Sequence, residues 1–425
     1  MAKPSKKIIT YIEFFFKILA LCFLAYVVCL AFVFPAITSS DDYWFSFFLV
    51  LILAISSFCE YFFGMSYSIL ISADQKNYLT NVLSFATTLL TFILSVVLIL
   101  NKCSILIVKL ACSFILVLEP ILLSFYCKRK YKLSKVKIDK NEDLLPQKWS
   151  GLGVHIAYYL HRNTDIFLIT IFLSLTTVSV YSVYNMIISG ILTVIECLSL
   201  GVESALGDMY AKNETDALKS RFKTFVFYYQ FLDTILLSCT TILIIPFIKI
   251  YTANISDADY INKLFAVLFI IAEFFYCLRV PYNNLMVATN SFKKIKTGAY
   301  AEAIINIACS IIFIRVFGLI GAPLGTICAM AYRLVHYLYF FKNHELSLPI
   351  RWFMKNSLAS CVILGSSIAF AFFDVLNPSS YLTWLAIAVV AFISVTLYAI
   401  LIYIVICRKS VFDFIKFLKE KLARK

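Results

Sequence analysis

Twelve apolar segments divide the chain, and each is long enough to cross a bilayer as a helix. A spanning helix needs about 20 predominantly apolar residues. The segments that meet this length are 8–34, 44–71, 79–100, 105–126, 153–174, 178–206, 222–251, 261–288, 298–316, 319–341, 356–373 and 382–407. Because 62% of the residues are hydrophobic, against about 45–50% in soluble proteins, we predict an all-α polytopic membrane protein.

Lysine and arginine gather in alternate loops. They lie before the first segment and after the second, fourth, sixth, eighth, tenth and twelfth, and the remaining loops carry few of them. The positive-inside rule therefore places the basic loops and both termini in the cytoplasm. The net charge of +14 is explained by these loops and does not require a nucleic-acid partner.

The longest loop separates a front group of helices from a back group. We predict four transmembrane helices in residues 1–127, a basic cytoplasmic linker in 128–150 and six helices of a second lobe in 151–343. Residues 344–407 supply two helices with no ionisable residue in their interiors, so we expect them to be peripheral. Residues 408–425 form a basic cytoplasmic tail. The two lobes are expected to surround a central polar cavity.

Two neighbouring segments between residues 151 and 209 carry polar stripes that lipid would not tolerate. The first stripe consists of His155, Tyr158, Tyr159, Arg162 and Asp165, and the second of Tyr181, Asn185, Ser189, Thr193, Glu196, Ser199 and Glu203. The spacing in each stripe places its members on one face of a helix. Such faces turn toward each other or toward a water-filled cavity.

Three arginines lie within apolar segments, and each stands on a different helix. Arg162, Arg279 and Arg333 are expected to converge on one anion, for which the bidentate guanidinium of arginine suits a pyrophosphate. The alternative is that each arginine neutralises one carboxylate, as Arg162 would with Asp165 or Glu196. Those two acids are also candidate proton or cation acceptors for coupled transport.

Two further features bear on chemistry and on helix geometry. The 13 cysteines form no CxxC pair and no cluster with histidine, so we predict no metal site, disulfide framework or cofactor. We expect Pro281, with Asn283 and Asn284 after it, to break the end of segment 261–288.

A series of short motifs runs in order along the chain. The most specific is Asn163-Thr164-Asp165-Ile166, preceded by Gly151-Leu152-Gly153 and followed by Val180-Tyr181-Ser182-Val183-Tyr184. Others lie at 73–76, 205–209, 279–293, 302–306 and 318–326. In this order they resemble the bacterial polysaccharide flippases, the O-antigen and capsule-repeat exporters of the multidrug/oligosaccharidyl-lipid/polysaccharide superfamily.

The resemblance implies a transporter, not an enzyme, in the bacterial cytoplasmic membrane. Such a protein moves an undecaprenyl-diphosphate-linked oligosaccharide to the outer leaflet, beside lipid, the repeat-unit polymerase and other assembly proteins. Arg162, Arg279 and Arg333 would then hold the diphosphate, with His161 beside them, and Tyr181 and Asn185 would face sugar. The Asn-Thr-Asp helix is usually the seventh in these flippases and is the fifth here, so the first lobe is expected to lack two helices.

Three rival functions remain open. A small-molecule exporter of the same superfamily would need a cavity with few cations, because its substrates are cations. A membrane-embedded polymerase, ligase or acyltransferase would usually show a large outer loop or an acidic or histidine motif at a helix mouth, whereas the outer loops here are short. A non-transporting scaffold is the third possibility if the first lobe is incomplete.

Overall fold

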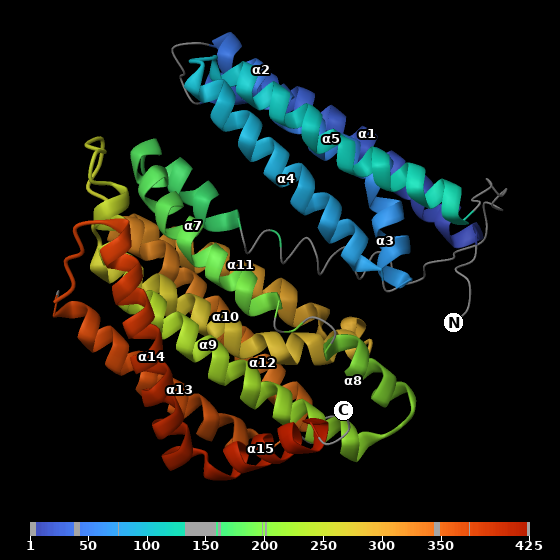
Figure 1. Ribbon diagram of the computed structural model, residues 1–425. Coiled ribbons are helices and arrows are strands. Elements are labelled where there is room, and N and C mark those ends of the chain that lie inside the picture. Colours follow the sequence, from blue (N-terminus) through green and yellow to red (C-terminus); the bar gives the residue numbers. More distant parts are fainter. Residues whose placement is uncertain are drawn as a thin grey trace. The chain divides into compact units, whose positions relative to one another are not determined.

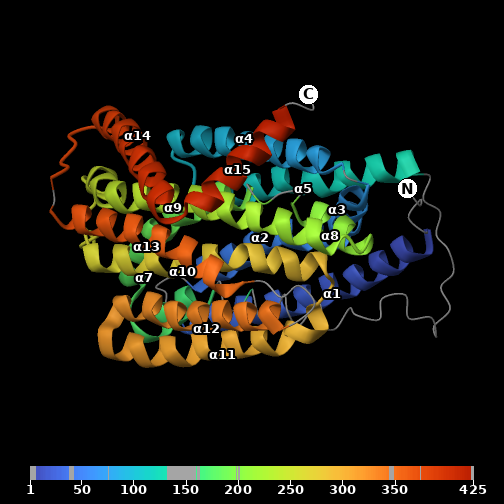
Figure 2. The ribbon, with the colours of Figure 1, turned by 90° about the horizontal axis from the view of Figure 1, so that it is seen from below.

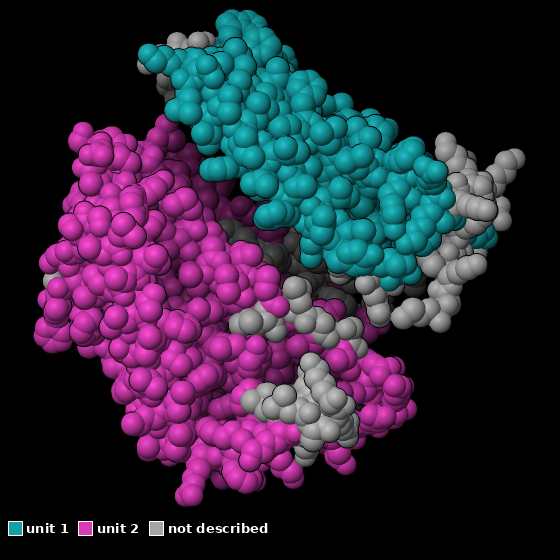
Figure 3. Space-filling view, viewed as in Figure 1, with its two compact units in different colours: residues 1–146 teal, residues 147–425 magenta. Residues whose placement is uncertain are grey.

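The computed structural model describes residues 6–37, 43–74, 76–131, 159, 163–197, 199, 202–343, 349–373 and 375–422. Every regular element in these ranges is a helix. The chain divides into two compact units, residues 1–146 and 147–425 (Figure 3). Ten stretches of the described residues are long and apolar enough to cross a membrane. The predicted all-α polytopic fold is therefore confirmed.

The ten stretches follow the predicted segments closely. Nine of them correspond to one predicted segment each, and the tenth, Ile295–Asn343, contains two predicted segments in succession. The segment predicted at 153–174 is described as a helix only over Asn163–Phe172, which we call the Asp165 helix. Its earlier residues, apart from Tyr159, lie outside the described part of the chain.

Unit 1 is a bundle of long helices. Its elements are α1 (Lys6–Ile37), α2 (Tyr43–Cys59), the π-helical turn η1 (Glu60–Gly64), α3 (Met65–Ala73), α4 (Asn77–Leu100) and α5 (Ile105–Tyr131) (Figure 1). The elements α2, η1 and α3 form one continuous transmembrane stretch. The π turn is a local feature that the apolar pattern did not predict, since hydropathy does not distinguish helix types.

Close packing against α5 marks the position of the π turn. A Cβ on Gly64 would lie 2.7 Å from the Cβ of Pro120, so only glycine permits this approach. Beside Pro120, the carboxylate of Glu119 accepts hydrogen bonds from the hydroxyls of Ser84 and Thr87, the latter at 3.1 Å. These bonds from α4 satisfy an acid that would otherwise be costly within an apolar segment.

Unit 2 contains the remaining helices. After the Asp165 helix these are α7 (Leu175–Cys197), α8 (Val202–Ala211), α9 (Thr215–Tyr251), α10 (Lys263–Ala288), α11 (Phe292–Phe317), the 3-10 turn η2 (Gly318–Ile320), α12 (Gly321–Asn343), α13 (Ile350–Phe372), α14 (Tyr381–Ile406) and α15 (Arg408–Leu422). The helix α9 is the core of this unit, because most of its apolar window is buried by its neighbours.

The helix predicted over 178–206 is interrupted, which corrects the sequence prediction. The helix α7 ends at Cys197 and α8 begins at Val202. At the break, the Oγ of Ser199 donates a 2.7 Å hydrogen bond to the carbonyl of Glu196, and the amide of Val202 bonds to the carbonyl of Ser199. A serine hydroxyl that competes for backbone carbonyls favours a turn at this point. Glu203 therefore lies on α8, apart from the α7 stripe.

The predicted break at Pro281 is wrong, because α10 continues to Ala288. Residues beyond the proline, including Tyr282, Leu285 and Met286, are buried against neighbouring helices. The packing of these side chains maintains the helix despite the missing backbone donor, as is common for proline in transmembrane helices.

The helices α11 and α12 form a tight hairpin. Figures 1 and 2 both show them side by side. The turn between them begins at Gly318 with φ of 63°, a left-handed conformation that favours glycine. A Cβ on Gly325 would lie 2.1 Å from the Oγ of Ser310. The glycine therefore allows α12 to approach α11 closely enough for polar side chains of the two helices to meet.

The last helices pack on α9 in different ways. The helix α13 has a buried polar face, from which Ser357 accepts a hydrogen bond from Gln230 of α9, while Ser360 bonds to Tyr403 of α14. The helix α14 leaves most of its surface exposed, and it begins with a capping box in which Ser380 and Thr383 exchange hydrogen bonds. The helix α15 contacts α9 through Phe414, whose ring centroid lies 5.7 Å from that of Phe227.

Candidate functional site

A cavity of about 390 Å³ lies within unit 2, between the Asp165 helix, α7, α10 and α12. It is lined by Tyr159, Asn163, Asp165, Ile166, Tyr181, Asn185, Ser189, Leu192, Phe269, Glu273, Tyr276, Thr326 and Met330. Both polar stripes predicted from the sequence therefore contribute to one cavity. The first stripe contributes Tyr159 and Asp165, and the second contributes Tyr181, Asn185 and Ser189. The volume of this cavity is within the range of small-ligand sites.

A network of side chains from three helices positions Asp165 at this cavity. The carboxylate is almost fully buried, and its Oδ2 accepts a 3.0 Å hydrogen bond from the Oγ1 of Thr326 on α12. The Nδ2 of Asn306 on α11 donates in turn to Thr326 at 3.3 Å. Among the described residues, the other oxygen of Asp165, Oδ1, has no hydrogen-bond partner. One carboxylate oxygen is thus available for a proton or a cation.

The polar stripe of α7 forms another wall. Tyr181 is buried and stacks on Phe269, with ring centroids 5.4 Å apart and an angle of 23° between the planes. Asn185 and Ser189 follow on the same face and are half-buried. An aromatic face beside amide and hydroxyl groups can bind a sugar, because the ring contacts C–H groups and the polar atoms bind hydroxyls.

Glu196, the lower member of the stripe on α7, lies next to this wall. Its Oε1 accepts a 2.6 Å hydrogen bond from the hydroxyl of Tyr276 on α10, and Tyr276 itself lines the cavity. Asp165 and Glu273 make the described lining acidic. None of the described residues that line it is a lysine, arginine or histidine.

Two of the predicted arginines meet at a single carboxylate. Arg279 on α10 and Arg333 on α12 each lie 3.2 Å from Glu302 on α11, and all three side chains are at least nine-tenths buried. Arg333 also donates to the hydroxyl of Tyr337 at 2.9 Å, and that hydroxyl bonds to Asn283. Two guanidinium groups against one carboxylate leave a positive charge within the bundle.

Tyr276 joins this arginine pair to the cavity. The Cζ of Arg279 lies 5.0 Å from the centroid of the Tyr276 ring, which is cation–π distance. Neither Arg279 nor Arg333 is among the cavity-lining residues. The tyrosine therefore forms the wall that separates the arginines from the hollow.

Four predicted residues lie outside the described part of the chain, namely His155, Tyr158, His161 and Arg162. Thr193 is described, but it does not line the cavity. Glu302 and Thr326 were not among the predicted site residues. Glu302 stands alone as an acid in its apolar segment, which signals a partner, but nothing in a single helix identifies two arginines on two other helices. Thr326 carried no signal, since threonine is common in transmembrane helices.

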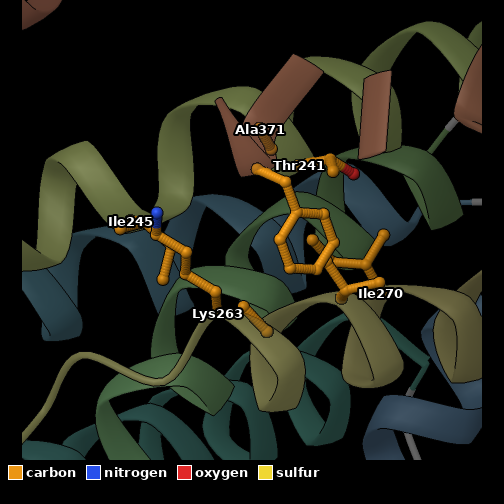
Figure 4. A pocket seen from close by; sticks show the side chains of 8 residues that line it. Thr241, Ile245, Lys263, Ile270 and Ala371 are labelled. Atoms are coloured by element: carbon orange, nitrogen blue, oxygen red, sulfur yellow. The ribbon is translucent and has the colours of Figure 1, made fainter. Parts of the chain in front are cut away.

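A second, smaller hollow lies between α9, α10 and α13 (Figure 4). Thr241, Lys263 and Ala371 are among its lining residues, and its volume is about 10 Å³. A cavity needs about 10–15 Å³ to hold one water molecule. This hollow is therefore too small for a sugar or a lipid headgroup.

Comparison with known proteins places the fold. The sequence matches no family model and no curated protein. Among solved structures, the chain superimposes on one with a TM-score of 0.66 over 95% of its own length and 85% of the other chain. The chain is similar in fold to the lipid II flippase MurJ.

The MurJ structure in question has an inward closed conformation and is 18% identical in sequence to this chain. At this identity the likeness shows the fold. The chain therefore shares the fold of that flippase. The cargo and the roles of individual residues must be inferred from the chemistry of the site.

Proposed function

We propose that this chain moves an undecaprenyl-diphosphate-linked oligosaccharide from the cytoplasmic to the outer leaflet of the bacterial cytoplasmic membrane. The observation that carries the proposal is the cavity of unit 2, with its stacked Tyr181 and the amide of Asn185, in a chain with the fold of the flippase MurJ. The name of MurJ gives lipid II as its cargo. For the present chain, the sequence motifs favour an O-antigen or capsule repeat unit as the cargo.

The diphosphate is assigned to the arginines. Arg279 and Arg333 share one carboxylate, so their combined charge exceeds that of Glu302. In the conformation described here, Glu302 forms ion pairs with both guanidinium groups. We infer that an anionic headgroup replaces Glu302 when the site is loaded, and that Arg162 joins the pair. Buried charge-assisted hydrogen bonds to a diphosphate are strong enough to compete with such an internal pair.

Coupling is assigned to the two acids near the cavity. One oxygen of Asp165 has no hydrogen-bond partner in the described part of the chain, and Glu196 accepts a hydrogen bond from Tyr276 at the cavity wall. Each is a candidate acceptor for a proton or cation that accompanies transport. In this assignment His161, Tyr181 and Asn185 contact the oligosaccharide.

The test uses cells in which a surface polysaccharide depends on this gene. Arg162→Ala, Arg279→Ala and Arg333→Ala are made singly, with Arg351→Ala on the exposed start of α13 as the control. Because loss of an arginine can also unfold the bundle, polymer is compared at equal protein abundance. Arg279→Lys and Arg333→Lys retain charge but lose the planar fork. We expect less polymer in every variant except the control. Normal polymer in all three alanine variants at normal abundance would overturn the diphosphate assignment.

One observation favours a second candidate, a small-molecule exporter of the same superfamily. The described lining of the cavity contains two carboxylates and no cation, which suits a cationic substrate. Deletion of the gene distinguishes the two. Increased sensitivity to cationic drugs with unchanged polysaccharide would favour the exporter. Lipid-linked repeat units trapped on the cytoplasmic leaflet would favour the flippase, and unpolymerised units on the outer leaflet would favour a polymerase.

A further inference from the structure

A second buried acid lies in unit 2, away from the residues that line the cavity. Asp233 stands at the middle of the 37-residue helix α9 and is fully buried. Its Oδ1 accepts a 3.2 Å hydrogen bond from the hydroxyl of Thr234, while its Oδ2 has no hydrogen-bond partner among the residues that the structure describes. No ion pair with Asp233 occurs among the residues that the structure describes.

The neighbours of Asp233 are polar but bring no positive charge. One turn before Asp233, the side chain of Gln230 donates to the Oγ of Ser357 at 3.3 Å, and its Oε1 has no hydrogen-bond partner within the described ranges. An ionised carboxylate at this depth, without a cation, costs several kcal/mol (order of magnitude). A neutral, protonated carboxyl avoids this cost.

The titratable groups around Asp233 come from several helices. Tyr403 on α14 lies close enough to be influenced by its charge, and the hydroxyl of Tyr403 bonds to that of Ser360 at 2.7 Å. On α9 itself, one turn away, Tyr229 is fully buried, and its hydroxyl has no hydrogen-bond partner in the part of the chain that the structure describes. The other groups near these two tyrosines are Cys407 between α14 and α15, Tyr276 and Cys277 on α10, and Glu196 on α7.

We propose that Asp233 is a proton-binding site, protonated on Oδ2 in the conformation described here. A role of this proton in driving transport rests on the proposed function. The binding of the proton does not.

Infrared spectroscopy of the full chain in lipid bilayers at neutral pH detects the bound proton. The wild-type spectrum is expected to contain the carbonyl band of a protonated carboxylic acid that Asp233→Asn loses. Asp216→Asn, on the exposed start of the same helix, is the matched control and should retain the band. Aspartate with a heavy carbon isotope in its side-chain carboxyl must shift the band in the unsubstituted protein. If Asp233→Asn leaves the spectrum unchanged, the acid is ionised and the proposal fails.

This measurement does not require transport, so its result is independent of the results on polysaccharide export.

Discussion

The hydroxyl of Tyr276 donates a 2.6 Å hydrogen bond to Oε1 of Glu196. This bond joins α10 to the last turns of α7, just before the chain breaks toward α8. The same tyrosine lines the cavity and carries Arg279 against its ring. One side chain therefore connects the hollow, an acid on α7 and the arginine pair, and a change in any of them is transmitted to the others through contact.

Replacing Tyr276 with Phe tests this connection. The ring remains, so the contact with Arg279 is retained, but Glu196 loses its donor. Loss of a hydrogen bond to a charged group costs about 1–3 kcal/mol when the partner is left unsatisfied. We expect a lower thermal unfolding temperature in detergent and reduced export of polysaccharide. Tyr300→Phe on the exposed face of α11 is the control. An unfolding temperature equal to that of the wild type would show that the bond contributes nothing.

Glu302→Gln tests the shared carboxylate. The substitution leaves two buried guanidinium groups without their counter-charge, and breaking a buried ion pair in this way costs about 3–5 kcal/mol. We expect poor expression or a marked loss of thermal stability, measured on purified protein. Glu214→Gln, at the exposed start of α9, should have little effect. Wild-type stability in Glu302→Gln would mean that Arg279 and Arg333 do not depend on this acid.

The close approach of α11 and α12 predicts opposite results at two glycines. Gly325→Ala would bring its Cβ to 2.1 Å from Ser310, whereas nothing lies within 4 Å of a Cβ on Gly190. Overpacking costs about 1–3 kcal/mol, and alanine in an open helical position gains up to about 1 kcal/mol. Thermal unfolding should therefore occur at a lower temperature in Gly325→Ala and at an equal or higher one in Gly190→Ala. Equal effects of the two substitutions would contradict the packing described here.

A pH-dependent contact ties the turn after α3 to the end of α5. The side chain of Asp74 accepts hydrogen bonds from Lys76 and, at 2.6 Å, from Tyr131. The hydrogen bond from Lys76, followed by that from Tyr131, lowers the pKa of Asp74 below its usual value. A depressed pKa stabilises the fold above the pKa of the unfolded state, about 3.9, and this contribution is lost as pH falls through the folded-state pKa.

Asp74→Asn should therefore unfold at a lower temperature than the wild type at neutral pH. The difference should shrink once the pH falls below about 4 and then disappear. Thermal unfolding of the full chain across a pH series measures it, with Asp216→Asn as the control. A difference that stays constant down to the lowest pH would exclude an ionised Asp74 as its cause.

Much of the fold could be predicted from the sequence because hydropathy alone determines where a helix crosses a membrane. The predicted start of 105–126 coincides with that of α5, and 79–100 ends where α4 ends. The periodicity of 178–206 also predicted that Tyr181, Asn185 and Ser189 share a face, and all three line the cavity with Asp165.

The rest depended on contacts between helices, which a single sequence does not reveal. At the turn, the hydroxyl of Ser199 donates a hydrogen bond to the backbone carbonyl of Glu196. The apolar pattern of the sequence predicted a continuous helix there. Glu302 was visible as a lone acid, yet its two partners stand on α10 and α12. The persistence of α10 beyond Pro281 is due to buried neighbours that do not appear in the local sequence.

The measurement that tests the central claim most directly is lipid transfer by the purified full-length chain in proteoliposomes. An undecaprenyl-diphosphate carrying a fluorescent oligosaccharide is placed in both leaflets, and a membrane-impermeant reagent quenches only the outer label. The account predicts that label from the inner leaflet becomes accessible in the presence of the chain, and more slowly with Arg279→Lys. If the folded protein leaves the inner label as protected as it is in protein-free liposomes, the account is contradicted.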